Sequence, residues 1–199
     1  MGDVEEMKTE NFESLLIKFE ETLKRYNPRN YEKLQPPLPE QQLNYHLDKL
    51  HLNYPEMKLL FGWRNGVNLS KGIFSSDKIF YMGTMLSLEH IVSSSEKYPH
   101  ENPHLIPLVR DIAGDGLLIN NEAGNDYGRI YLYSVALLSI DDPYSCYDSI
   151  YSLLKTTIKA YETQALKYDY EEDYLDSDTS KFWEIAKELN PQSSYWKLE

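Results

Sequence analysis

The chain has 199 residues, 41% of them hydrophobic, so it is long enough for one sizeable core and short for two. Its formal net charge of −12 argues against nucleic acid as a partner, because backbone phosphates would be repelled, and favours a basic protein. Cys146 has no second cysteine to pair with, no signal segment opens the chain, and no apolar run approaches the roughly 20 residues that span a bilayer. We therefore expect a cytoplasmic, single-domain protein that binds neither nucleic acid nor membrane.

An amphipathic helix is predicted at the N-terminus. Apolar residues recur at helical spacing over residues 12–26, whereas the charged residues among them, including Glu20, are expected to face water. Asn27-Pro28 ends the pattern, because the residue before a proline avoids the helical region. Residues 1–27 are interpreted as a helix that packs on the rest of the domain.

Two further helices are each expected to begin at a proline. Pro39 and Pro55 suit the first helical turn, where the missing N–H is not needed. The helix after Pro55 carries Trp63 in one stripe with two leucines, and we expect this tryptophan to be buried where the helix meets the sheet. Gly66 is expected to be the left-handed residue just past the helix end.

The middle of the chain changes to the period of strands. Strands are expected at residues 78–82, 105–109, 117–119 and 130–133, with a helix capped by Ser87 between the first two. The turns around Gly116 and at residues 124–128 are short enough to join neighbouring strands as hairpins. The central sheet should therefore be mainly antiparallel.

Helices return near the C-terminus. A helical stripe begins at about Ser145, and a last helix ends before Pro191. Helices that flank an antiparallel sheet define an α+β fold, and we assign residues 28–197 to one such domain. The final Leu198-Glu199 is typical of a cloning remnant, to which we assign no role.

One segment matches the H-E-x-x-H pattern of zinc hydrolases, in which a helix places two histidines on one face and the glutamate acts as general base. Here His100, Glu101 and His104 carry the pattern, but Pro103 lies inside it. An interior proline costs a helix about 3 kcal/mol, which favours a polar loop. A zinc hydrolase is kept as a third hypothesis only because the letters match.

No other pattern supports catalysis. The chain lacks the serine-nucleophile, phosphate-binding and dinucleotide-binding glycine motifs. The segment from Asp111 to Glu122 partly matches a calcium loop, but Ala113 offers no side-chain oxygen and the flanking residues favour strands. We expect no enzyme activity, no metal and no cofactor.

A segment rich in tyrosine and acid is the candidate partner-binding surface. Tyrosine combines an apolar ring with a polar tip and is favoured at protein interfaces, and the chain has 17 tyrosines. We read residues 168–178 as a loop, and the alternative interpretation is a solvated connection. The candidate contact residues are Tyr168, Asp169, Tyr170, Glu171, Glu172, Asp173, Tyr174, Asp176 and Asp178.

Four short segments together resemble the SUKH superfamily, which includes yeast cell-wall assembly regulators and many bacterial immunity proteins. They are Pro36-Pro37, Tyr54 to Gly66, Ile106 to Ile119 with its Gly-Asp-Gly turn, and Asn190 to Trp196. The resemblance implies a mostly antiparallel sheet packed against helices and a role in binding proteins. It implies no catalytic residues, and Pro55, Trp63, Gly66 and Gly116 are expected to be structural.

The leading hypothesis is an immunity protein that neutralises a cognate secreted toxin, with an acidic face matched to a basic nuclease. Charge complementarity would speed encounter with such a partner. The alternative is a regulatory or scaffold protein that binds a cellular partner, as in the cell-wall assembly regulators.

Overall fold

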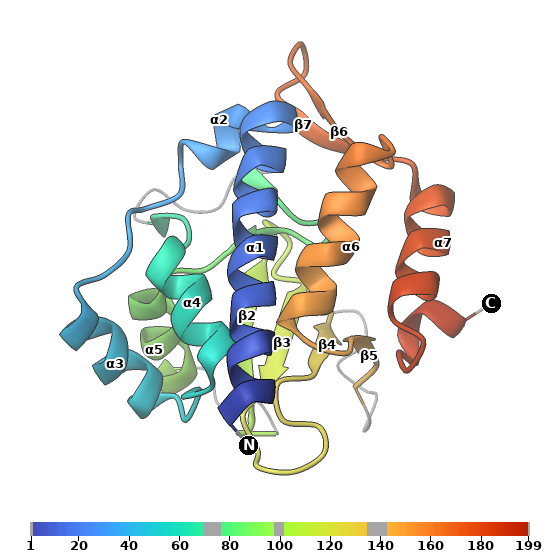
Figure 1. Cartoon of the computed structure of the whole chain (residues 1–199). Coiled ribbons are helices and arrows are strands. Elements are labelled where there is room, and N and C mark those ends of the chain that lie inside the picture. The colour runs from blue at the N-terminus through green and yellow to red at the C-terminus, as the bar shows by residue number, and fades with distance from the viewer. Residues whose placement is uncertain (1, 70–76, 98–101, 135–142, 199) are drawn as a thin grey trace.

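A computed structural model describes residues 2–69, 77–97, 102–134 and 143–198. Figure 1 shows an α+β fold in which helices cover one face of a central sheet. The helices are α1 (Gly2–Tyr26), α2 (Pro28–Tyr31), α3 (Glu40–Lys49), α4 (Pro55–Trp63), α5 (Leu88–Lys97), α6 (Ile150–Glu162), α7 (Thr179–Leu189) and the short 3-10 helix η4 (Tyr195–Lys197). The strands are β1 (Thr84–Met85), β2 (Leu105–Arg110), β3 (Gly116–Asn120), β4 (Ile130–Tyr133), β5 (Ser145–Tyr147), β6 (Leu166–Asp169) and β7 (Tyr174–Ser177).

The central sheet follows the order of the chain, β1-β2-β3-β4-β5, and each neighbouring pair is antiparallel. The expected fold class is confirmed, as are the expected strands at 105–109, 117–119 and 130–133. Gly116 opens β3 beside a register shift between Pro107 and Val109. A Cβ on Gly116 would lie 2.0 Å from the carbonyl oxygen of Val109, so the close approach of these two strands requires glycine.

The prediction of a strand at residues 78–82 is wrong. Phe80 and Gly83 instead bond each other's backbone N–H and carbonyl groups in a tight turn, and β1 begins only at Thr84. Ile79 and Phe80 are both buried. These residues are apolar because they form a turn that is buried in the core. A short apolar run in the sequence does not distinguish such a turn from a strand.

The helix expected from about Ser145 begins five residues later, at Ile150, because residues 145–147 form the edge strand β5. Ser149 caps α6: its hydroxyl oxygen accepts the N–H of Ser152 at 3.2 Å, and the hydroxyl of Ser152 accepts the N–H of Ser149 at 3.1 Å. This reciprocal pair fixes the helix start.

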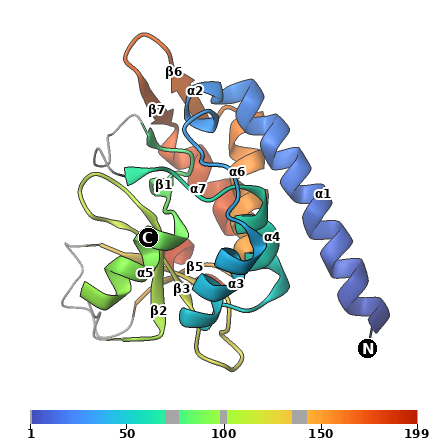
Figure 2. The ribbon, with the colours of Figure 1, turned by 90° about the vertical axis from the view of Figure 1, so that its left-hand side faces the viewer.

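The N-terminal helix is confirmed and ends at Tyr26, directly before Asn27-Pro28. Its buried residues include Phe12, Phe19 and Leu23, which face α4 and α6. Figure 2 shows α1 farther from the sheet than α4 and α6, so these two helices lie between α1 and the strands.

The position predicted for Trp63 is wrong. Its ring is half-buried and packs against α1, with its centroid 5.5 Å from that of Phe19, whereas the deeply buried aromatic residue of α4 is Phe61. The indole N–H of Trp63 donates to Glu20 at 2.9 Å. Glu20, which was expected to face water, therefore lies at the contact between two helices, where it also accepts from Tyr31 and pairs with Lys24.

Pro55 is the first residue of α4, as expected, while Pro39 lies one position before α3, at its N-cap. Gly66 has the expected positive φ, 62°, although it lies three residues beyond the last helical residue, Trp63. A Cβ there would lie 2.3 Å from the carbonyl oxygen of Leu86. Position 66 therefore requires glycine for two reasons, which are the positive φ and the close approach to the segment that follows β1.

Gly66→Ala should destabilise the protein by at least about 1–2 kcal/mol, since the left-handed backbone alone costs that amount and the clash with Leu86 adds to it. Gly62→Ala is the control, because Gly62 is exposed in α4 with its nearest neighbour at 3.9 Å, and this change should stabilise by up to about 1 kcal/mol. Urea denaturation of both variants checks the prediction. Equal midpoints for the two variants would contradict it.

Glu20 should make stability depend on pH in acid. Hydrogen bonds from Lys24, Tyr31 and Trp63 lower the pKa of Glu20 from 4.5 to about 2. Because the folded-state pKa lies below the unfolded value, this carboxylate contributes its full stability above pH 4.5 and loses it as the pH falls from about 4.5 to about 2. Glu20→Gln should flatten the decline in unfolding free energy across that window.

The matched control is Glu21→Gln, which removes the same charge from an exposed neighbouring position. It should retain the steep acid decline. If the two glutamine variants lose stability in parallel below pH 4.5, the helix contact at Glu20 does not contribute in the way proposed.

Candidate functional site

The segment that was expected to be a loop at residues 168–178 is mostly a β-hairpin. Strands β6 and β7 pair in the register Leu166 with Ser177, Lys167 with Asp176, Tyr168 with Leu175 and Asp169 with Tyr174. Figures 1 and 2 both show the hairpin projecting from the end of the molecule where α2 lies. The tyrosine and acid pattern thus belongs to a regular element with two distinct faces.

The inner face of the hairpin is apolar. Tyr168 is 3% exposed and Leu175, its cross-strand partner, is 8% exposed. Because side chains alternate along a strand, Tyr174 and Asp176 lie on the outer face, where both are exposed. We call Lys167, Asp169, Tyr174 and Asp176 the outer face, and Tyr170, Glu171 and Glu172 the tip.

The tip is ordered by hydrogen bonds of its own. Asp169 Oδ1 accepts the backbone N–H groups of Glu171 at 2.8 Å and Glu172 at 3.1 Å, and these bonds lower the pKa of the Asp169 carboxyl. Asp173 completes the turn with a left-handed backbone, φ 55°. Tyr170 is 60% exposed at this ordered tip, so a partner can reach its ring without rearranging the turn.

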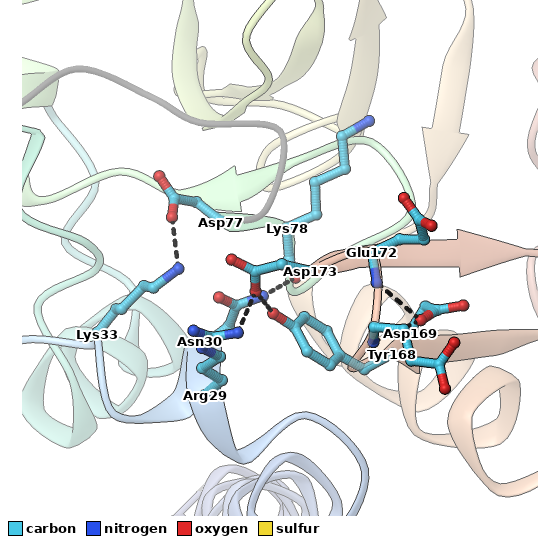
Figure 3. Close-up of polar contacts among 10 residues, drawn as sticks. Arg29, Asn30, Lys33, Asp77, Lys78, Tyr168, Asp169, Glu172 and Asp173 are labelled. Atoms are coloured by element: carbon cyan, nitrogen blue, oxygen red, sulfur yellow. Dashed lines mark hydrogen bonds and ion pairs between the residues drawn. The ribbon is translucent and has the colours of Figure 1, made fainter.

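The hairpin is fastened to α2 by one carboxylate. Asp173 Oδ1 accepts from Arg29 at 2.7 Å and also from the hydroxyl of Tyr168 (Figure 3). The hydrogen bond from Tyr168 and the charge of Arg29 lower the pKa of Asp173, whereas burial, followed by Asp173 itself, raises the pKa of the Tyr168 phenol. Asp173 therefore stays ionised and holds the inner face against the body.

A deeper layer of amide groups supports this contact. Asn27 and Asn30 are fully buried, and their side-chain N–H groups donate to the carbonyl oxygen of Lys78 at 3.0 and 2.9 Å. Asn27 also donates to the hydroxyl of Tyr161, which in turn donates to the carbonyl oxygen of Ile79. We call these five residues, together with Arg29 and Asp173, the polar anchor.

An ion pair flanks the polar anchor. Lys33 Nζ lies 2.8 Å from Asp77 Oδ1, and Asp77 is 4% exposed. In Figure 3 the ammonium group of Lys78 points away from these contacts, so only the backbone of Lys78 takes part in them. Asn27 and Asn30 thereby hold the backbone at Lys78, while the Lys78 side chain extends away from them.

The structure divides the candidate contact residues into two groups. Asp173 holds the hairpin to α2 through Arg29, and Tyr168 is buried and donates to Asp173 within the hairpin. Asp178 caps α7 by accepting the N–H of Lys181 at 3.1 Å. Asp169 orders the tip. The residues that remain exposed toward solvent are Tyr170, Glu171, Glu172, Tyr174 and Asp176.

Charge and aromatic area coincide on the exposed group. Its three carboxylates flank two tyrosine rings, and the carboxylate of Asp176 raises the pKa of the Tyr174 phenol. Lys167 lies opposite Asp176 across the strand pair and is the one basic side chain of the hairpin. This surface is therefore suited to a partner that presents positive charge and apolar area together.

The segments considered for catalysis have other surroundings. His100 and Glu101 lie outside the described residues, and His104 Nδ1 lies 3.2 Å from Asn121 Oδ1. Among the residues that the structure describes, no group of three or more His, Cys, Asp or Glu side chains is placed to hold a metal ion. Cys146 is buried in β5, and burial raises the pKa of its thiol, so the reactive thiolate is disfavoured.

Comparison of the sequence with protein-family models and with curated proteins finds no match. In the described part of the chain no helix is both long and apolar enough to cross a membrane.

Sequence reasoning missed the polar anchor. Arg29 and Asp173 are 144 residues apart, and Asn27 lies 51 residues from Lys78, so no local pattern joins them. Asn27 and Asn30 offered the only signal, since two amide side chains close to Pro28 at a helix junction can donate to a backbone carbonyl. That signal names donors but not their acceptors.

Asp173→Asn should loosen the hairpin without unfolding the domain. The amide is a weaker acceptor for Arg29 and Tyr168 than the carboxylate, so the ladder N–H groups of residues 166–177 should exchange with deuterium faster. The urea midpoint should change little, because an exposed ion pair contributes little to global stability.

Asp176→Asn provides the control, as it removes the same charge from the outer face of the same hairpin. In this variant the backbone N–H groups of residues 166–177 should exchange at the wild-type rate. Equal exchange in Asp173→Asn and wild type would show that the hairpin does not depend on this carboxylate.

Proposed function

We propose that the protein is a non-catalytic binding protein that recognises a basic protein partner through the tip and outer face of the β6–β7 hairpin. The observation that carries the proposal is the exposure of Tyr170 and Tyr174, 60% and 38%, among carboxylates on a hairpin whose inner face is fastened to the body. Two tyrosines gathered with carboxylates on one ordered element favour a protein interface, because aromatic side chains supply much of the binding energy there.

The two kinds of side chain divide the work of binding. Carboxylates at Glu171, Glu172 and Asp176 attract a basic partner over roughly 8 Å at physiological salt and thus speed association. The rings of Tyr170 and Tyr174 then bury apolar area and slow dissociation. Since the tip is already ordered by Asp169, little conformational entropy is lost on binding.

The proposed biological role is immunity. The resemblance to the SUKH superfamily supports an intracellular protein that neutralises a cognate secreted toxin, and the net charge of −12 supports a basic toxin such as a nuclease. Recognition would then block the toxin by covering its active surface. A regulatory or scaffold role would use the same hairpin on a cellular partner, and the identity of a protein captured from the source organism separates the two.

Reversing Glu171 and Glu172 to Lys should slow association with the captured partner and reduce its dependence on salt, with dissociation less affected. Tyr170→Ala or Tyr174→Ala should instead speed dissociation, because a buried aromatic anchor can contribute about 2 kcal/mol or more. Binding kinetics measured at several salt concentrations separate the two effects.

The control reverses Glu40 and Glu122, two exposed acids outside the hairpin, and so makes the same change in net charge. If binding weakens equally in both double variants, only the overall charge matters and the hairpin is not the site. Retention of wild-type kinetics by the charge variant and by both tyrosine variants would exclude the hairpin altogether.

A further inference from the structure

A cavity opens beside the base of the hairpin, at the end of the central sheet. Its volume is about 330 Å³, at the small end of the roughly 300–1,000 Å³ range of ligand pockets. The turn between β2 and β3, the end of β4, the last residue of β7 and η4 all contribute to its wall. The residues that matter for its chemistry are Lys78, Tyr81, Asp111, Asp115, Ser177 and Tyr195.

The aromatic part of the wall is rigid. The ring of Tyr81 stacks on Phe182 with centroids 4.1 Å apart, and the ring of Tyr195 meets Trp196 edge to face at 4.7 Å. Trp196 is itself buried and donates its indole N–H to the carbonyl oxygen of Cys146 at 2.5 Å. Two tyrosine rings are thus held at the cavity by a cluster that packs on β5.

The polar part of the wall carries a net negative charge. Asp111 and Asp115 contribute two carboxylates and Lys78 one ammonium group. Asp111 Oδ1 accepts the N–H groups of Ala113 and Asp115 at 2.8 and 3.1 Å, so the turn fixes this side chain. Its Oδ2 lies 3.8 Å from Lys78 Nζ, a distance too long for a hydrogen bond.

We propose that this sheet-end cavity receives an arginine side chain of the basic protein partner. The inference rests on the proposed function, and it adds a specific contact to the hairpin surface. A guanidinium group is planar, stacks on aromatic rings and pairs with carboxylates, which matches the two kinds of wall. Ser177 lies in both the hairpin and the cavity wall, so one partner can cover the hairpin and insert a side chain beside it.

The size of the cavity also supports an arginine. The small volume suits one extended side chain better than a cofactor. Interfaces concentrate binding energy where an aromatic or arginine side chain fills such a pocket near the contact centre.

The test uses the full chain and L-argininamide as the probe. In NMR titrations the ring resonances of Tyr81 and Tyr195 should shift, and citrullinamide, the uncharged analogue, should leave them in place. The double change Asp111→Asn with Asp115→Asn should weaken argininamide binding about threefold to fivefold, the effect expected for partly exposed charge pairs. Asparagine at 111 can still accept the N–H groups that form the turn.

The control makes the double change Glu122→Gln with Asp126→Asn, which removes the same two charges from the turn between β3 and β4 and should leave argininamide binding unchanged. Equal shifts from citrullinamide, or no shift at either tyrosine ring of the wild-type protein, would overturn the proposal.

The two proposals fail separately. Reversal of Glu171 and Glu172 should weaken binding of the captured partner while argininamide still reaches the cavity. If argininamide does not bind but reversal of Glu171 and Glu172 weakens partner binding, the arginine pocket is refuted and the hairpin proposal stands. Argininamide binding with an unaffected partner would refute the hairpin as the partner site.

Discussion

The structure depends on the hydrogen bonds that the buried side chains of Asn27 and Asn30 donate to the carbonyl oxygen of Lys78. A buried carbonyl group without a partner is costly, so the residues around Lys78 need donors from elsewhere in the chain. The junction between α1 and α2 supplies them, and Tyr161 of α6 satisfies the carbonyl oxygen of Ile79 in the same way. Three segments distant in sequence are thereby held in one arrangement.

Both proposed contacts are positioned by this arrangement. Arg29 lies between the two asparagines and reaches Asp173, so the orientation of α2 sets the position of the hairpin. Lys78 is held by its backbone on one side and extends its ammonium group toward Asp111 on the other, where it forms part of the cavity wall. A recognition surface made of a short hairpin gains affinity when it is ordered before binding, because less conformational entropy is lost.

The sequence predicted elements with long, regular patterns and failed where tertiary contacts decided. Helices α1, α6 and α7 carry extended apolar stripes, so their existence was predictable, whereas the edge strand β5 explains why the start of α6 was misplaced. Residues 78–82 were predicted to be a strand because they are apolar, but they are apolar because the turn is buried and not because they pair with a strand. Trp63 was misplaced because its stripe shows that it packs but not on which neighbour, and that neighbour is α1.

The candidate site was predictable as a segment but not as a surface. Tyrosines and acids identified the region, while its division into an inner and an outer face depended on the register of β6 and β7. Tyr168 and Tyr170 differ by only two positions, yet one is 3% and the other 60% exposed. The cavity could not be predicted, because Tyr81, Asp111 and Tyr195 meet only in the folded chain.

The central claim is that the tip and outer face of the hairpin contact a basic protein partner. Hydrogen–deuterium exchange of the protein alone and with a partner captured from the source organism tests it most directly. Protection should concentrate in residues 166–177 and in the turn at 111–115 that borders the cavity. Protection confined to the turn at residues 124–128, at the far end of β3 and β4, would contradict the claim and move the interface there.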